Sequence, residues 1–260
     1  MPKKKETQFE LNWKTAEQLL EERKNIERIP TGTPLDELIG GGIEVGEVIE
    51  FYGEYGSGKT QISFTLATYV SGQLKQDVVF IDCEGTFRPE RIREIAINRG
   101  YDPNEVLKRI YVAQPKTTDE QIAALEKIPK DIKPKLIVID GVTTLFRSEY
   151  IGRETLAEKQ GLLRKYLYNL KRYARENNAA IVVTNQVYQS PEASPFLPLE
   201  LRELSSGGHS LYHAIDNRIF IRKSKNGIRI ARLVDSSMYP TQERPFQITE
   251  KGVEPPREQS

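Results

Sequence analysis

Continuous runs of hydrophobic residues recur along the chain and predict strands that are buried on both faces. Residues 136–140, Leu-Ile-Val-Ile-Asp, form the clearest run. Such runs are typical of parallel sheets with helices on both sides. Between the runs, apolar residues recur every three or four positions, which predicts amphipathic helices. The predicted strands are 48–52, 78–82, 109–113, 136–140 and 180–184, and the predicted helices are 16–26, 61–71, 89–99, 118–128 and 156–177.

The pattern changes in the C-terminal third of the chain. Residues 217–222 and 228–234 alternate between apolar and polar positions around Asn226-Gly227, a dipeptide that favours a β-hairpin. Residues 246–249 predict a last strand, whereas residues 189–206 lack periodicity and predict a long, functional loop. Strand-helix alternation followed by a hairpin predicts an α/β fold with a mixed, mostly parallel sheet and helices on both faces.

Length and composition suit one large intracellular domain. We expect an N-terminal arm at residues 1–28, the α/β domain at 29–252 and a disordered tail at 253–260. The net charge of +1 gives no global field for nucleic acid, so a DNA site must be local. Cys83 is the only cysteine, which excludes an intrachain disulfide and fits a reducing cytosol. No apolar run is long enough for a membrane span, and we expect a cytoplasmic protein.

One motif predicts a nucleotide site. Residues 53–60 fit the phosphate-loop pattern G-x-x-x-x-G-K-[ST] between a predicted strand and a predicted helix. Its glycines let successive N–H groups point at one anion, and the helix N-terminus adds its dipole. Lys59 would reach the β- and γ-phosphates, and the Thr60 hydroxyl would bind magnesium. The predicted ATP-binding residues are Gly53, Glu54, Tyr55, Gly56, Ser57, Gly58, Lys59, Thr60 and Gln61.

Polar residues follow the other predicted strands at the same edge of the sheet, where open α/β sheets bind ligands. Asp140 ends the most apolar strand, and a carboxylate there holds magnesium in phosphate-loop NTPases. A carboxylate after the second strand, Asp82 or Glu84, could polarise the attacking water, and Glu84 could equally be a surface residue. The amide in Thr184-Asn185-Gln186 could sense the γ-phosphate, or the segment could be a simple turn.

Two further clusters have weaker signals. His209 and His213 have the spacing of a metal pair, but no third ligand type completes a set, so we do not expect zinc. Basic residues gather around the predicted hairpin and form either a solvated face or a path for a polyphosphate. They are Arg218, Arg222, Lys223, Lys225, Arg229 and Arg232.

Taken together, the motifs resemble one family, the RecA-like recombinases of the archaeal RadA and eukaryotic strand-exchange type. The resemblance covers about residues 13–252 and implies a RecA-like phosphate-loop NTPase core with a C-terminal β-hairpin. The segments that carry it are 53–61, 81–91 (IDCEGTFRPER), 136–140, 146–153 (FRSEYIGR), 184–187 (TNQV), 207–209, and 230–232 with Asp235.

The resemblance implies roles for individual residues. Glu84 is similar to the family's catalytic glutamate, which activates water, and Lys59 and Gln186 complete the catalytic set, with Gln186 as γ-phosphate sensor. Further ATP contacts are implied for Arg91 on the adenine, for His213, and for Asp235 and Pro240 on the ATP of a neighbouring subunit. Thr60 and Asp140 are the implied magnesium ligands. The first DNA loop is implied to use Arg147, Tyr150 and Arg153, and the segment after Val187 resembles the second.

The implied function is an ATP-dependent recombinase core in homologous recombination and DNA repair, with ATP and Mg²⁺ as cofactors. Its partners would be single-stranded DNA, with double-stranded DNA left open, and further copies of itself in a filament or ring. Trp13 to Ala16 resembles the aromatic-x-x-Ala strand that adds to the next subunit's sheet edge. ATP hydrolysis would release the DNA.

Departures from the family pattern favour an alternative, a recombinase paralogue that binds the main recombinase and has weak or DNA-insensitive turnover. The family's N-terminal helix-hairpin-helix domain has no counterpart, and Gly141 stands where serine is usual. The second DNA loop is locally acidic, with Glu192, Glu200 and Glu203 against Arg202. Pro115 falls at the sheet edge expected to accept the neighbour's strand. A signalling ATPase that ignores DNA is disfavoured by the match in the first DNA loop.

Overall fold

The computed structural model describes residues 13–152, 154–189, 203–205 and 214–257. A sheet of ten strands forms its centre, in the order β12-β11-β10-β9-β3-β7-β6-β4-β5, with β8 paired to β7. The strands from β9 to β5 run parallel, and β8, β10, β11 and β12 are antiparallel to their neighbours. The bounds are β3 Val48–Gly53, β4 Val78–Asp82, β5 Ile110–Ala113, β6 Leu136–Asp140, β7 Ala180–Gln189, β8 Glu203–Ser205, β9 Asn217–Lys223, β10 Arg229–Ser236, β11 Gln242–Thr249 and β12 Gly252–Glu254.

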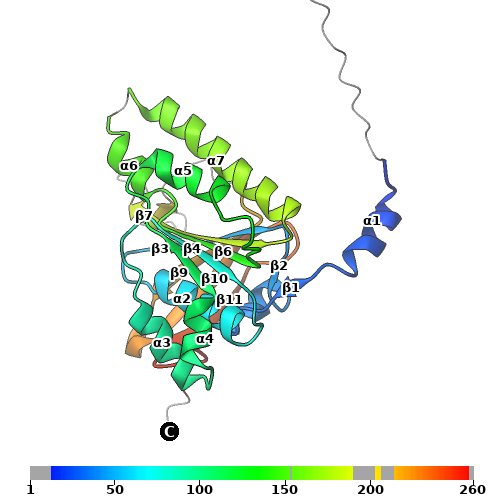
Figure 1. Ribbon diagram of the computed structural model, residues 1–260, viewed down its shortest axis with the longest axis vertical. Coiled ribbons are helices and arrows are strands. Elements are labelled where there is room, and N and C mark those ends of the chain that lie inside the picture. The colour runs from blue at the N-terminus through cyan, green and yellow to red at the C-terminus, as the bar shows by residue number, and fades with distance from the viewer. Residues whose placement is uncertain (1–12, 153, 190–202, 206–213, 258–260) are drawn as a thin grey trace, which may run out of the picture.

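Helices cover both faces of this sheet, and Figure 1 shows them as two separate layers. One layer contains α2 (Lys59–Gly72), α3 (Pro89–Asn98) and α4 (Pro103–Lys108), and the other contains α5 (Thr118–Glu126), α6 (Thr144–Glu149) and α7 (Leu156–Glu176). Successive residues of a strand point to opposite faces, so each central strand contributes to two cores. On β6, Val138 packs in the α2 core, whereas Ile137 and Ile139 pack in the α7 core. The predicted mixed sheet between two helical layers is confirmed.

The N-terminal region differs from the prediction. The predicted helix at 16–26 is α1 (Ala16–Arg23), which has no buried residue and stands away from the body in Figure 1. The expected strand at Trp13 to Ala16 is absent from this chain by itself, because Thr15 and Gln18 form a capping box that starts a helix at Ala16. Next come β1 (Arg28–Ile29), η1 (Pro34–Ile39) and β2 (Ile43–Glu44).

The C-terminal hairpin is confirmed, but the ordered chain continues beyond residue 253, where the disordered tail was expected to begin. β9 and β10 are joined through η2 (Lys225–Gly227), where Asn226 adopts a φ of 56°. The expectation of disorder from residue 253 is wrong for the start of that segment, because β12 pairs with β11 and Val253 is 1% exposed. Within the described part of the chain, no helix has both the length and the apolar character that a membrane crossing requires.

Candidate active site

The phosphate loop connects the end of β3 to the start of α2, as its sequence predicts. Gly53 must be glycine because a Cβ there would lie 2.1 Å from the Ile221 carbonyl oxygen. Gly58 adopts a φ of 113° immediately before α2, so the loop curls toward the helix N-terminus. The backbone of the loop therefore adopts this conformation without a bound ligand.

The Lys59 side chain folds back onto this loop and binds its carbonyl oxygens. Its ammonium donates to the carbonyl oxygens of Gly53 and Glu54, at 2.8 Å each. The side chain is buried, and burial lowers its pKa, although the carboxylates of Glu84 and Asp140 oppose that shift. A buried cation in a loop that leads into a helix N-terminus suits a polyphosphate.

Thr60 and Asp140 meet across the sheet edge. The Thr60 hydroxyl donates to the Asp140 carboxylate at 3.0 Å, and the Thr184 hydroxyl donates to the same group at 2.5 Å. Burial raises the pKa of Asp140 to about 6, although these two hydrogen bonds work against the shift. Oxygen donors of this kind are the ligands that Mg²⁺ prefers, so the pair fits the magnesium ion predicted there.

The two carboxylates after β4 have different environments. Asp82 is buried and accepts hydrogen bonds from the backbone N–H groups of Thr86 and Phe87 and from the Gln114 amide, at 2.9–3.1 Å. It therefore fixes the turn that follows β4, and it is not available to attacking water. Glu84 lies in that turn and lines the cavity beside the phosphate loop.

Gln186 and Glu84 contact each other, which favours the sensor interpretation over the simple turn. The Gln186 amide on β7 donates to Glu84 Oε1 at 2.7 Å, and the Thr144 hydroxyl on α6 donates to the same oxygen at 3.2 Å. Carboxylate, amide and hydroxyl thus come together from three elements at one edge of the sheet.

The cavity beside the loop measures about 460 Å³ and is lined by Lys59, Thr60, Glu84 and Gln186. Arg91 lies at its wall, where α3 holds the guanidinium through hydrogen bonds to Gln61 on α2 and to the Thr249 carbonyl on β11. A planar, fixed guanidinium is suited to stacking on a purine base.

The basic cluster of the hairpin divides into structural and site residues. Arg218 is buried in an ion pair with Glu50 at 2.7 Å, and Arg222 and Arg232 lie near Glu243. Arg229 instead lines the cavity, and Lys223 lies beside Gly56, where a Cβ would be 3.2 Å from its ammonium. Arg88 and Thr86 also line the cavity. The position of Arg229 at the cavity favours the polyphosphate path over a solvated face for this part of the cluster. The sequence did not separate Arg229 from the rest of the cluster, because only the pairing of β9 with β3 brings the hairpin to the loop.

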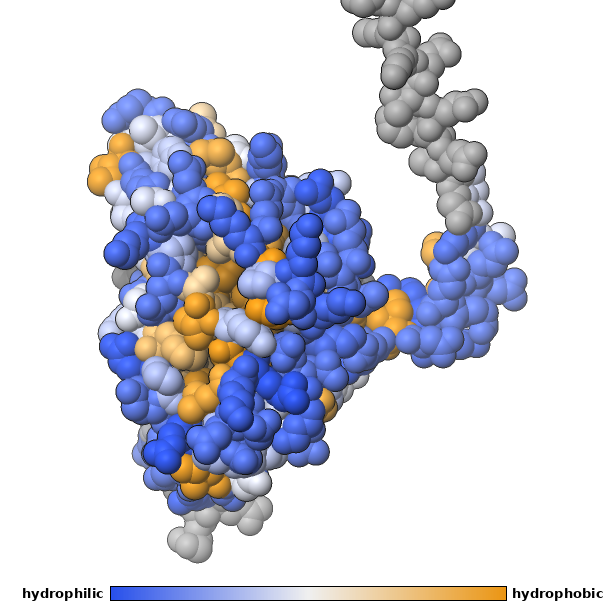
Figure 2. Space-filling model, viewed as in Figure 1, coloured by the Kyte–Doolittle hydropathy of each residue, from blue (hydrophilic) through white to orange (hydrophobic). Residues whose placement is uncertain are grey.

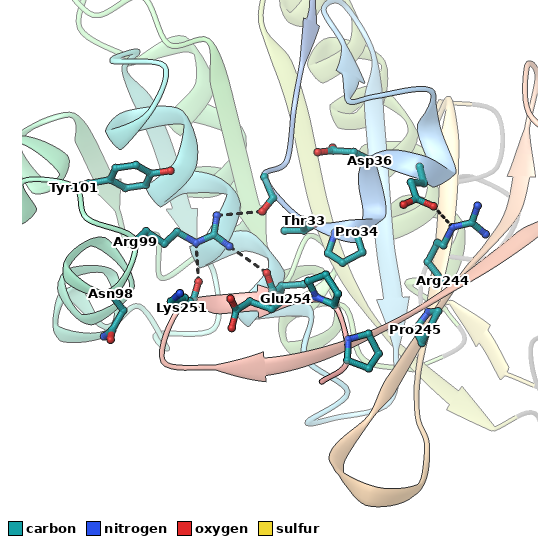
Figure 3. A pocket seen from close by; sticks show the side chains of 15 residues that line it. Thr33, Pro34, Asp36, Asn98, Arg99, Tyr101, Arg244, Pro245, Lys251 and Glu254 are labelled. Atoms are coloured by element: carbon teal, nitrogen blue, oxygen red, sulfur yellow. Dashed lines mark hydrogen bonds and ion pairs between the residues drawn. The ribbon is translucent and has the colours of Figure 1, made fainter. Parts of the chain in front are cut away.

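A larger cavity of about 750 Å³ lies on the side of η1, α3 and β12. Figure 3 shows that Arg99 points to backbone oxygens. Arg244 forms an ion pair with Glu37. Arg99 donates to the carbonyls of Lys251, Gly32 and Val253, at 2.7–3.1 Å. Both arginines are thus committed to contacts within the chain, which makes this cavity a poor phosphate site.

Other predicted site residues have varied positions. Arg147 is exposed on α6 and Tyr150 directly follows that helix, whereas Arg153 and His213 lie outside the described residues, as does most of the predicted second DNA loop. The exposed residues Asp235 and Pro240 do not line the cavity of this chain.

The surface around the edge strand β5 has apolar character. Tyr111 and Val112 on β5 are 40% and 42% exposed, and Trp13, which lies on the separate N-terminal arm, is 85% exposed. Figure 2 shows hydrophobic surface between the two helical layers, at the level of the sheet. The expectation that Pro115 interrupts this edge is wrong, because β5 ends at Ala113 and the proline lies beyond the strand.

Comparison with known proteins agrees with this arrangement. The sequence is 43% identical over 255 residues to the DNA repair and recombination protein RadA of Aeropyrum pernix, an alignment that covers 95% of this chain and 79% of the relative. Residues 22–256 match the Rad51 family model, and that range contains the phosphate loop, the Thr60–Asp140 pair and the Glu84–Gln186 pair. The chain belongs to the Rad51 family.

Proposed function

We propose that this chain is an ATP-dependent recombinase core that assembles on single-stranded DNA in homologous recombination and DNA repair. The observation that carries the proposal is the convergence of the phosphate loop, the Thr60–Asp140 pair and the Glu84–Gln186 pair beside α6, the helix that displays Arg147. The similar protein from Aeropyrum pernix is named for DNA repair and recombination, which supports the same role here.

Each group at the site has a task in ATP hydrolysis. The loop N–H groups and Lys59 bind the phosphates, and Thr60 and Asp140 would hold Mg²⁺, which neutralises charge on the β- and γ-phosphates. Glu84 accepts a proton from the attacking water, and Gln186 contacts the γ-phosphate and changes position when it is lost. Arg91 stacks on the adenine, and Arg229 adds positive charge at the cavity wall.

DNA binding and assembly use surfaces outside the nucleotide cavity. Arg147, Tyr150 and Arg153 contact the phosphates and bases of the DNA. Because the net charge of the chain is only +1, DNA binding needs a local basic site of this kind. Trp13 and Ala16 dock on the sheet edge of the next copy, as aromatic anchors do in interfaces. Asp235, Pro240 and His213 then contact the ATP that is bound between two copies. The assembly works in the cytoplasm, on the chromosome.

Steady-state ATP hydrolysis with Mg²⁺, measured with and without single-stranded DNA, tests the proposal. We expect DNA to raise kcat, and we expect Lys59→Ala to lose nucleotide binding because it removes the cation that faces the phosphates. Glu84→Gln should keep ATP binding and lose about a hundredfold in kcat, the usual scale for a general base. Unaltered hydrolysis by Lys59→Ala would refute the site.

A second candidate is a recombinase paralogue that binds the main recombinase and turns over ATP weakly. The observation that favours it is the acidic character of residues 189–206, where Glu192, Glu200 and Glu203 oppose Arg202. Phosphate groups repel such a segment. Slow hydrolysis that DNA does not change, together with tight nucleotide binding, would favour this candidate over the recombinase core.

A further inference from the structure

Two donors from different elements hold the same oxygen of Glu84. The Gln186 amide on β7 and the Thr144 hydroxyl on α6 both donate to Oε1, at 2.7 Å and 3.2 Å. A carboxylate oxygen accepts hydrogen bonds at about two lone-pair sites, so these donors fill Oε1. A water molecule that is to transfer its proton to this oxygen must therefore displace one of the donors.

Gly141 makes this contact possible. Its backbone adopts a φ of 84°, a conformation that favours glycine, directly after the magnesium-site residue Asp140. A Cβ at this position would lie 2.6 Å from Glu84 Cγ and 2.7 Å from Thr144 Oγ1. Any side chain at residue 141 would push the glutamate and the threonine apart, so the Thr144–Glu84 hydrogen bond depends on this glycine.

Thr144 belongs to the helix that carries the proposed DNA contact. It is the first residue of α6, and one turn later the Arg147 N–H donates to the Thr143 carbonyl at 3.0 Å. The Thr143 side chain is buried and donates to Asn185 at 2.8 Å, which fixes the base of the helix next to Gln186. Thr144 and Arg147 lie one helical turn apart on α6, so a ligand that shifts Arg147 acts on the same turn that carries the Thr144 hydroxyl.

We propose that Thr144 is a positioning residue that holds Glu84 in place until DNA binds α6, so that ATP hydrolysis waits for DNA. The inference rests on the proposed function. Gln186 responds to the nucleotide and Thr144 responds to DNA, so each of the two ligands controls one donor on Oε1. When ATP is bound, loss of the Thr144 donor on DNA binding opens a lone-pair site on Oε1 for the attacking water.

The test is hydrolysis by Thr144→Val, which keeps the shape of the side chain and removes the donor. Without DNA, its kcat should rise about threefold to tenfold above wild type, which is the scale of one ordinary intramolecular hydrogen bond. The KM for ATP should stay unchanged, and the stimulation by single-stranded DNA should shrink by the same factor. Thr144→Ser keeps the hydroxyl and should retain the wild-type dependence on DNA.

Gly141→Ala is the second variant, because it displaces both side chains and leaves the hydroxyl present. It should weaken the stimulation by single-stranded DNA, because the Thr144–Glu84 hydrogen bond depends on the glycine, and melting temperatures show whether each variant is folded. Wild-type stimulation by DNA in both folded variants would overturn the inference, as would a loss of activity in Thr144→Val with and without DNA. A wild-type protein whose hydrolysis ignores DNA would instead refute the proposed function.

Discussion

At the scale of single residues, Asp140 shows how burial prepares the site for a cation. Burial raises the pKa of this carboxyl to about 6, and the hydroxyls of Thr184 and Thr60 offset only part of that shift. The nearby cation, Lys59, donates to loop carbonyls instead. The ionised carboxylate is therefore poorly compensated in the chain alone, and a divalent cation would stabilise it.

The stability of the metal-free protein should reveal this strain through its pH dependence. As pH rises from 3.8 to about 6, the unfolded chain loses the Asp140 proton before the folded chain does. This carboxyl therefore lowers the free energy of unfolding in that window, by on the order of 3 kcal/mol. Asp140→Asn lacks this contribution, so urea unfolding without Mg²⁺ should show the variant gaining stability relative to wild type as pH rises. Parallel pH profiles would contradict the prediction.

The sequence identified site residues reliably where they belong to one continuous motif. It was a poorer guide to residues that only the fold brings together. Lys59 and Thr60 could be assigned because the phosphate loop fixes their positions by local backbone geometry. Asp82 and Glu84 could not be separated, since the difference lies in which of them accepts the N–H groups of Thr86 and Phe87. Arg229 lines the cavity only because β9 pairs with β3, and the hydrophobic pattern of the sequence does not predict the order of the strands.

At the scale of elements, the last strand supports the phosphate-loop helix. The Val253 N–H donates to the Thr65 hydroxyl on α2 at 3.0 Å, and the Val253 side chain is 1% exposed. Gly252, with a φ of 86°, passes so close to Thr65 that a Cβ would lie 2.3 Å from its hydroxyl oxygen. The C-terminal end of the sheet therefore helps to fix the helix that begins at Lys59.

Val253→Ala should lower the free energy of unfolding by about 1–3 kcal/mol, because it removes buried methyl groups and leaves a cavity against α2. Glu250→Ala is the matched control, since Glu250 is exposed in the same hairpin and should change stability by less than about 0.5 kcal/mol. Urea unfolding of the two variants measures the difference. Equal stability would mean that β12 contributes nothing to the packing of α2.

Strands that are buried on both faces could be predicted from the sequence, and some short peripheral elements could not. The parallel strands are buried on both faces, and that burial requires the continuous apolar runs that reveal them. α6 and β12 are only 6 and 3 residues long, too short for a hydrophobic period to repeat. The segment at Trp13 was expected to be extended, but in the chain alone a local capping box decides its conformation.

At the scale of the whole molecule, the exposed apolar surface lies on two separate parts. Trp13 is 85% exposed next to α1, a helix without a buried residue that stands away from the body in Figure 1. At the sheet edge, β5 pairs only with β4 among the described strands and exposes Tyr111 and Val112. A free strand edge is a template for pairing with another chain. The arm of one copy and the edge of the next could therefore bury each other's apolar groups.

Trp13→Ala should raise the protein concentration needed for ATP-dependent assembly by at least about tenfold, the usual cost of truncating an aromatic anchor. Its melting temperature as a monomer should not change, because the side chain is almost fully exposed. Light scattering with ATP, Mg²⁺ and single-stranded DNA measures the assembly. Tyr168→Ala on α7 is the control, since that aromatic residue is 67% exposed far along the chain from the arm and should leave assembly intact. If both variants assemble like wild type, contacts other than the arm must join the copies, and the exposed edge of β5 would need another partner.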